Sequence, residues 1–265
     1  MQPTTYDITG SLRLLVRVRS GDVHISAGEG SSATVQVIGD RDEGVTVEHH
    51  VGADGNSTIE VRQRKEGWGL RDRDLRVAIT VPPGTVADVT TGSGDVRTEG
   101  TLAGLTLQSG SGDASIDVVA GPARVKHASG DLRVRRVDGS LTVATASGDI
   151  DVETVGAAFE ARTASGDIEV GMAAGPTKAM SASGDITIAS SLGDVSLRSV
   201  SGDIAIGVPA NTRVWFDVSS TSGDAVSELD HDDSDGRDAA FEIKAASVSG
   251  DIRIRRAPAR DTTAA

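Results

Sequence analysis

Cysteine is absent from the 265-residue sequence, and aromatic residues make up only 2% of it. The lack of cysteine excludes a disulfide framework and thiolate chemistry. Basic residues are too few to balance the acidic ones, and the net charge is -13 at pH 7. This charge argues against nucleic-acid binding and against a polybasic membrane patch, because both require a basic face.

Long apolar runs are also missing, so no segment is expected to span a membrane. Residues 1–7 lack the basic and apolar regions of a signal peptide. We therefore expect a cytoplasmic protein. The alternative is a cell-surface protein that reaches the surface by an unrecognised route.

What the sequence does contain is a repeat. The tripeptide Ser-Gly-Asp occurs seven times between residues 93 and 203, always 18 residues apart. A fixed period of this kind indicates a solenoid. Counted from each serine, aliphatic residues occupy offsets 3 and 5, such as Ile150 and Val152, and again offsets 12 and 14, such as Phe159 and Ala161. Residues two apart lie on one face of a strand, so each repeat is predicted to form two strands and two turns.

The spacing also selects among solenoids. Inward pairs that recur every nine residues favour two facing sheets, whereas a three-sided hexapeptide helix would repeat every six. We predict an all-β fold, a single-stranded parallel β-solenoid (β-helix) of 18-residue two-sided coils with irregular N-terminal β coils. Three regions are expected: an irregular β region at 1–90 continuous with the solenoid, a regular solenoid at 91–257 with an acidic insert at 228–238, and a disordered tail at 258–265.

Ser-Gly-Asp is interpreted as the corner of each coil. Glycine can adopt positive φ, and aspartate can accept hydrogen bonds from nearby backbone N–H groups. The predicted structural turn residues are Gly94, Asp95, Gly112, Asp113, Gly130, Asp131, Gly148, Asp149, Gly166, Asp167, Gly184, Asp185, Gly202 and Asp203.

Polar residues at other offsets predict further contacts. Offset 16 is expected to form an internal hydroxyl ladder from coil to coil. This column consists of Ser109, His127, Thr145, Thr163, Ser181 and Ser199. Outward-facing Asp117 is expected to meet Arg135 of the next coil. The last strand carries Arg253, Arg255 and Arg256 and is expected to end the solenoid, where its charges would discourage edge-to-edge growth.

Candidate chemistry is sparse. The acidic insert partly matches a calcium-loop pattern, with Asp233, Asp235 and Glu242 in ligand positions. No flanking helices are expected, so a solvated acidic loop is favoured over a metal site. The histidines lack zinc-like spacing, and no nucleotide or hydrolase motif occurs. We expect no catalytic residues and no cofactor. Trp68 is the main aromatic candidate for a binding loop.

The Ser-Gly-Asp-Ile-type repeats, Val-Pro-Pro-Gly-Thr at 81–85 and Val-Ser-Gly-Asp-Ile-Arg-Ile at 248–254 carry a resemblance over nearly the whole chain. The sequence resembles the bacterial β-strand-repeat family of putative adhesins, a domain of unknown function. This resemblance implies a β-solenoid and an interaction role at the surface or envelope, and it supplies no catalytic residues.

Three functions follow as hypotheses. The first is a non-enzymatic β-solenoid scaffold or binding module whose partner is an unknown protein or envelope component. The second is a calcium-stabilised, β-roll-like surface module, and the third is a glycan-acting β-helix enzyme. The Trp68 loop and the 228–238 insert interrupt the regular repeat, so they are the first places to look for a function.

Overall fold

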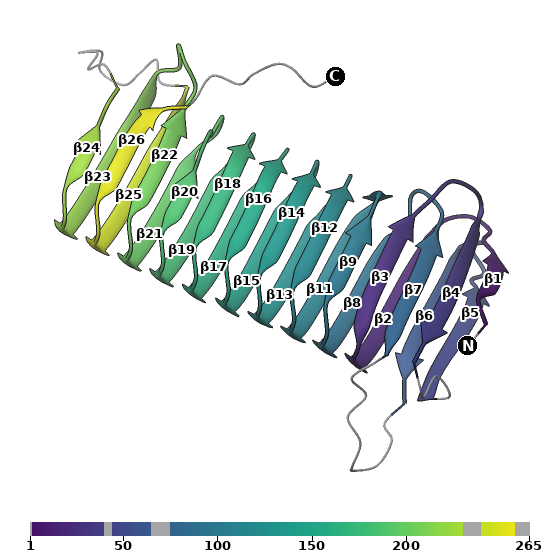
Figure 1. Cartoon of the computed structure of the whole chain (residues 1–265). Coiled ribbons are helices and arrows are strands. Elements are labelled where there is room, and N and C mark those ends of the chain that lie inside the picture. Colours follow the sequence, from purple (N-terminus) through teal and green to yellow (C-terminus); the bar gives the residue numbers. More distant parts are fainter. Residues whose placement is uncertain (1, 40–43, 65–74, 230–239, 258–265) are drawn as a thin grey trace. The chain divides into compact units, whose positions relative to one another are not determined.

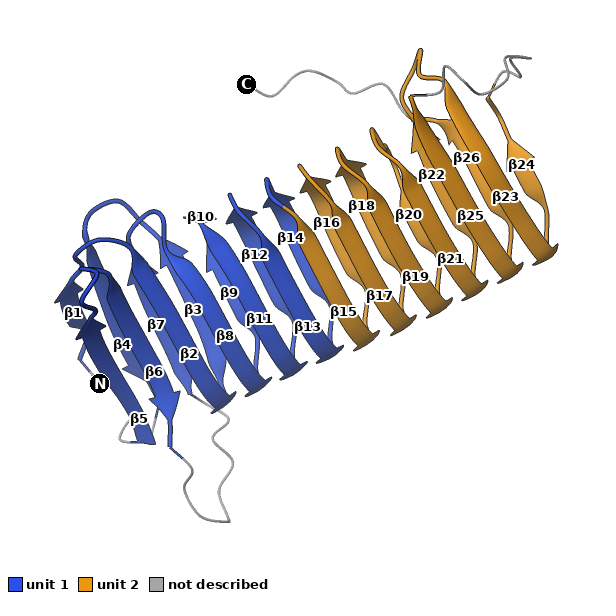
Figure 2. Cartoon of the chain, turned by 180° about the vertical axis from the view of Figure 1, so that it is seen from behind, with its two compact units in different colours: residues 1–139 blue, residues 140–265 orange. Residues whose placement is uncertain are grey.

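The computed structural model describes residues 2–39, 44–64, 75–229 and 240–257. These residues form 26 strands joined by turns, with no α-helix among them (Figure 1). The all-β prediction is therefore confirmed. The chain divides into two compact units, residues 1–139 and 140–265, which are described separately (Figure 2). The expected division near residue 90 stays a prediction.

The described residues of unit 1 form fourteen strands. They are β1 (Thr4–Asp7), β2 (Leu12–Ser20), β3 (Asp22–Ala27), β4 (Ser32–Ile38), β5 (Val45–Val51), β6 (Ser57–Gln63), β7 (Arg76–Val81), β8 (Val86–Ser93), β9 (Val96–Glu99), β10 (Thr101–Leu102), β11 (Gly104–Ser111), β12 (Ala114–Val119), β13 (Ala123–Ser129) and β14 (Leu132–Val137).

These strands form two sheets. Within unit 1, one sheet has the order β1-β4-β7-β3-β9-β12-β14 and the other β13-β11-β8-β2-β6-β5, with β10 also pairing with β12. The strands pair in parallel except for β1, β4 and β5, which join the sheets antiparallel. The β2–β3 coil lies between the β6–β7 coil and the β8–β9 coil, although it precedes both in the sequence. The N-terminal region is thus irregular, as expected, and its coils are not stacked in sequence order.

In unit 2, twelve strands are formed by the residues that the structure describes. They are β15 (Leu141–Ser147), β16 (Ile150–Val155), β17 (Phe159–Ser165), β18 (Ile168–Ala173), β19 (Thr177–Ser183), β20 (Ile186–Ile188), β21 (Val195–Ser201), β22 (Ile204–Val208), β23 (Val214–Ser222), β24 (Ala225–Ser227), β25 (Phe241–Ser249) and β26 (Ile252–Arg256).

The sheets of unit 2 are entirely parallel in its described residues. Their orders are β15-β17-β19-β21-β25-β23 and β16-β18-β20-β22-β26-β24. The last coil in sequence, β25–β26, is inserted between β21–β22 and β23–β24 (Figure 1). The expectation that the strand bearing Arg253 ends the solenoid is therefore wrong. Strand β26 has a neighbour on each side, and β24 is the edge strand.

The core lies between the two sheets of each unit. The four predicted columns are buried, and Ile150, Val152, Phe159 and Ala161 are each at most 1% exposed. Alternation explains this, because every second side chain of a strand points between the sheets. A fifth buried column was not predicted from the sequence. In each repeat its residue comes directly after two consecutive outward-facing residues, at the end of the first strand or just after it. Its members are Val119, Val137, Val155, Ala173 and Ser191.

The hydroxyl column at offset 16 differs from the expectation. Thr163 Oγ1 donates to the carbonyl of Ser165, two residues further on, at 3.1 Å, and Ser109 makes the same contact with Ser111. Ser199 alone in this column reaches the neighbouring coil, where its Oγ lies 3.4 Å from the carbonyl of Gly184. Three of the six residues, Ser109, Thr145 and Thr163, therefore make local side-chain-to-backbone bonds. The buried ring nitrogens of His127 and the Oγ of Ser181 have no hydrogen-bond partner among the described residues.

Candidate binding groove

The Ser-Gly-Asp corners position the strands of the regular coils. The seven Ser-Gly-Asp glycines have φ between 108° and 148°, a conformation that residues with a side chain rarely adopt. The glycines at 94, 112, 130, 166, 184 and 202 also lie against the backbone of the adjacent coil. A Cβ built on Gly184 would lie 2.1 Å from the carbonyl oxygen of Gly166, and one on Gly166 would lie 2.2 Å from that of Gly148. Only glycine fits both conditions.

The aspartates form a hydrogen-bonded ladder. The N–H of Asp185 donates to Asp167 Oδ1 at 2.8 Å, and the N–H of Asp203 donates to Asp185 Oδ1 at 2.7 Å. The ladder continues through Asp251 to Asp224, in the spatial order of the coils. Unit 1 contains the same bonds, for example from the N–H of Asp113 to Asp95 Oδ1. Each bond gives a carboxylate a backbone donor, which offsets repulsion between stacked charges about 4.8 Å apart.

The predicted metal ligands are not assembled into a site. Asp233 and Asp235 lie outside the described residues, as do Trp68 and most of the 228–238 insert. Glu242 lies in β25, where its N–H donates to Asp194 Oδ1 and its carboxylate accepts from Lys244. In the part of the chain that is described, no group of three or more His, Asp or Glu side chains could hold a metal ion.

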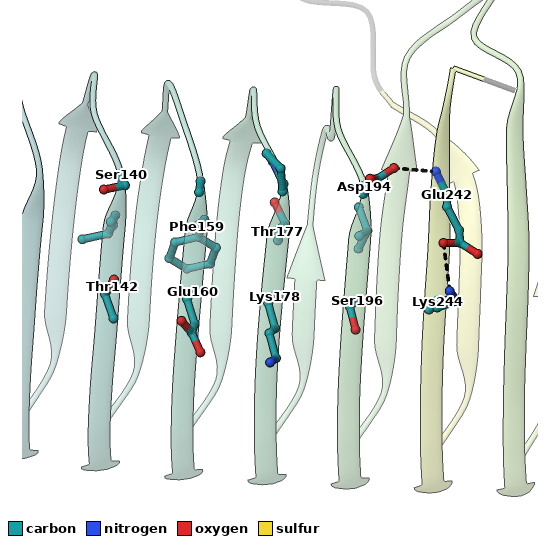
Figure 3. A pocket seen from close by; sticks show the side chains of 14 residues that line it. Ser140, Thr142, Phe159, Glu160, Thr177, Lys178, Asp194, Ser196, Glu242 and Lys244 are labelled. Atoms are coloured by element: carbon teal, nitrogen blue, oxygen red, sulfur yellow. Dashed lines mark hydrogen bonds and ion pairs between the residues drawn. The ribbon is translucent and has the colours of Figure 1, made fainter.

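A groove of about 440 Å³ crosses the beginnings of five adjacent strands in unit 2, namely β15, β17, β19, β21 and β25 (Figure 3). One wall consists of residues at the turns, such as Ser140, Pro176 and Asp194. The other consists of outward side chains one step into each strand. The second row runs Thr142, Glu160, Lys178, Ser196 and Lys244. The strands of this sheet run in one register, so the row repeats at the coil spacing.

The charges in the groove are largely paired. Lys244 Nζ donates to Glu242 Oε2 at 2.9 Å, and Arg162 Nη2 donates to Glu160 Oε1 at 2.7 Å. The hydrogen bond to Glu242 raises the pKa of Lys244 above its ordinary value. This shift favours the charged form of Lys244. The groove therefore presents hydroxyl, carboxylate and ammonium groups at regular intervals.

An exposed tryptophan, missed from the sequence, continues this surface. Trp215 on β23 is 44% exposed and lies in register with Glu242 of β25, one coil beyond the groove. The exposure of Trp215 could have been predicted from the alternation of side chains along the strand. Val214 and Phe216 face inward, so the residue between them must face outward.

Unit 1 has a second hollow, with a volume of about 490 Å³, over β3, β7 and β9. Its charges also neutralise one another. Arg97 Nε donates to Glu99 Oε1 at 2.9 Å, and His24 Nε2 lies 3.3 Å from Glu99 Oε2. The charges of this hollow are thus paired as those of the groove are, but the hollow extends over three strands and the groove over five.

Asp117 and Arg135 meet on adjacent coils of unit 1, as expected. Arg135 Nε donates to Asp117 Oδ1, and the N–H of Gly100 donates to Oδ2 at 2.8 Å. The Arg135 hydrogen bond, opposed by partial desolvation, lowers the pKa of Asp117. A carboxyl whose pKa is lower in the folded state stabilises the fold above its unfolded pKa of about 4, and this stabilisation is lost as the pH falls through the folded value.

Asp117→Asn is therefore expected to lose up to ~1 kcal/mol of unfolding free energy at pH 7 and progressively less as the pH falls below the unfolded pKa. Urea denaturation of the variant and the wild type at pH 7 and at pH 3 measures the difference. Ser115→Ala, on the same strand and outward-facing, is the control and should show no pH dependence. An equal loss for Asp117→Asn at both pH values would contradict the assignment.

The fold and its corners define the class of protein, a parallel β-solenoid of two-sided coils with stacked Gly-Asp corners. Residues 12–255 match the family model of the Toastrack domain DUF4097, and the chain belongs to that family. No curated protein matches the chain. The family match confirms the resemblance inferred from the sequence, at the level of the family and the fold.

Solved structures of similar fold exist. A putative adhesin from Bacteroides fragilis superposes with a TM-score of 0.53 at 15% identity, over 95% of each chain. A putative cell adhesion protein from Clostridium sporogenes has a TM-score of 0.29 at 9% identity, over 96% of this chain and 99% of that one. A putative lipid binding protein from Parabacteroides distasonis has a TM-score of 0.25 at 9% identity, over 95% and 96%. The first supports the fold, and the other two support no inference here.

Proposed function

We propose that the chain is a non-enzymatic binding module whose partner lies along the unit 2 groove. The observation that carries this proposal is the groove itself, which crosses five strands and repeats hydroxyl and charged side chains at the coil spacing. A partner that follows the groove would run across the strands, not alongside one of them. The length available is about 19 Å, four steps of the coil spacing.

Recognition in this groove is expected to depend on side chains. Strands β17, β19 and β21 each pair with a neighbour on both sides, so their backbone N–H and C=O groups are engaged within the sheet. A partner cannot bind them by adding a strand, the usual route for an extended peptide at a sheet edge. It would instead meet Thr142, Lys178 and Ser196 on one wall. An unknown protein or an envelope component remains the predicted partner.

A binding role is supported over a catalytic one by the pairing of the groove's charges. Lys244 and Glu160 each have an oppositely charged partner, and the raised pKa of Lys244 favours its charged form. The hypothesis of a glycan-acting enzyme finds no support in these groups. The calcium hypothesis likewise gains none from the corners, where the Asp Oδ1 atoms of the ladder accept backbone N–H groups.

The cellular location of the protein is part of the proposal. No helix in the described residues is long and apolar enough to cross a membrane. We retain the cytoplasm as the expected location and the cell surface as the alternative. Fractionation of the native host with an antibody against the chain separates the two.

The groove is tested by site-specific photo-cross-linking in the native host. A benzophenone amino acid at Thr142 is expected to give one dominant adduct, and the same group at Asp151, outward-facing on the opposite sheet of unit 2, is the control. Adding Ser196→Trp, which fills the groove, should reduce the Thr142 adduct about tenfold, equivalent to ~1.4 kcal/mol. Equal adducts at Thr142 and Asp151, or no effect of Ser196→Trp, would reject the groove as the binding site.

A further inference from the structure

The outermost coil of unit 2, β23–β24, leaves part of its core side uncovered. Val214, Phe216 and Val218 face inward on β23 and are all only half-buried. Their counterparts on the next coil are buried, with Phe241 at 7% and Ile243 at 0% exposure. The short strand β24 is exposed along its whole length. An apolar core that is closed within the stack is therefore open at this end, as far as the described residues show.

Both sheet edges are open at this end together. Strand β23 pairs with β25 on one side, and β24 pairs with β26 on one side. No other described strand pairs with either of them. Each outer edge thus presents a row of backbone N–H and C=O groups that can pair with another strand.

These edges lack the features by which proteins protect themselves from unwanted pairing. Such protection commonly uses lysine, proline or inward-pointing charge on the edge strand. Strand β23 contains no lysine or proline and a single charged residue, Asp217, while β24 contains no charged residue. In unit 1 the outermost strands differ, since β5 carries Glu48, His49 and His50 and pairs antiparallel with β6.

We propose that this open end binds the same end of a second copy of the chain, with β23 against β23 and β24 against β24. The occupant must fill two edges at once, separated by the distance between two packed sheets, about 10 Å. A single peptide strand fills one edge and leaves the other open, as well as the core between them. A second copy presents two edges at the same separation by construction.

Two-fold symmetry between the two copies would pair the edge strands. A two-fold axis perpendicular to both sheets places each edge strand against itself in antiparallel orientation, and Val214, Phe216 and Val218 then meet the matching residues across the axis. Such an interface is closed, so it yields a dimer and not a fibre. Asp217 is the only charged side chain along either strand, so few like charges come together. The interface uses no residue that lines the groove, and it stands whether or not the groove binds a partner.

Oligomeric state tests the proposal on the full chain. Light scattering after size exclusion is expected to give twice the 27.1 kDa chain mass, and the double variant Ser219→Lys/Val226→Lys should weaken association at least about tenfold, the equivalent of ~1.4 kcal/mol. Ser115→Lys/Thr187→Lys adds the same charge on outward faces of interior strands and should remain dimeric. Far-UV circular dichroism and thermal melting check that both variants fold.

A second readout identifies the surface. Since the chain has no cysteine, Phe216→Cys gives a single thiol at the middle of the three facing residues, directly opposite its own copy across the axis. This variant is expected to form a disulfide-linked dimer under mild oxidation, whereas Ser115→Cys should stay monomeric under denaturing conditions. A monomeric wild type at ~100 μM, well above the μM affinities of ordinary complexes, would overturn the proposal. So would a dimer unaffected by the lysines, a Phe216→Cys variant that forms no disulfide, or an open-ended polymer.

Discussion

The Gly166→Val variant is expected to lose more than ~4 kcal/mol of unfolding free energy, the range reserved for severe core or backbone damage. Two effects combine. Gly166 has a φ of 133°, which costs a valine ~1–3 kcal/mol. In addition, the new Cβ would lie 2.2 Å from the Gly148 carbonyl oxygen, so the two coils must separate. Because coils are stabilised by their neighbours, the damage should spread along the stack.

A matched control separates strain from the steric clash. Gly30 has a φ of 113°, and a Cβ there would have no atom within 4 Å. Gly30→Val should therefore show the cost of backbone strain alone, ~1–3 kcal/mol. Chemical denaturation followed by circular dichroism measures both variants. Equal losses for the two would contradict a contribution of close corner stacking to the stability of the fold.

Truncating Phe159 is expected to be the next most damaging change. Its ring is 1% exposed and is among the largest fully buried side chains. Strand β17 places it in register with Leu141 and Thr177 in the core column. Phe159→Ala should destabilise the fold by ~3–5 kcal/mol, the usual range for losing a buried phenylalanine and leaving a cavity. Denaturation midpoints and slopes of wild type and variant give this value.

The neighbouring residue provides the control for Phe159. Glu160 lies on the same strand with its side chain toward the solvent and paired with Arg162. Glu160→Ala should change the free energy of unfolding by less than ~1 kcal/mol, as is typical of a surface ion pair. A loss below ~1.5 kcal/mol for Phe159→Ala, half the low end of the usual range, would indicate that the core collapses around the missing ring.

The regular part of the fold could be predicted from the sequence because the 18-residue period fixes which residues face inward. Ile150 and Phe159 belong to different strands, yet each recurs in its column with an aliphatic or small residue. Few other folds satisfy that pattern. The positive φ of the corner glycines also follows from a local rule about which residue tolerates that conformation.

The stacking order of the coils and the geometry of the surface could not be predicted from the sequence in the same way. Nothing in the repeat reveals that β25–β26 inserts before β23–β24, because coil-to-coil pairing depends on long-range contacts and not on local pattern. For the same reason Arg253 was placed at an edge that it does not occupy. The groove requires knowledge of the side-chain register across five strands, whereas Trp215 could have been found from the alternation around it.

The insertion of β25–β26 affects the order in which the protein can be built. During synthesis β23 and β24 emerge before β25 and β26, but in the described residues their only sheet partners are those later strands. The β23–β24 coil must therefore wait, unpaired, until residue 256 has been made. The β2–β3 coil waits in a similar way for β6 to β9, since its neighbours on both sides follow it in the chain. Assembly from one end to the other, coil by coil in the order of translation, is therefore not available to this solenoid. Within each unit the coils stacked in sequence order can form first, and one coil, β2–β3 in unit 1 and β23–β24 in unit 2, docks after its neighbours have been made.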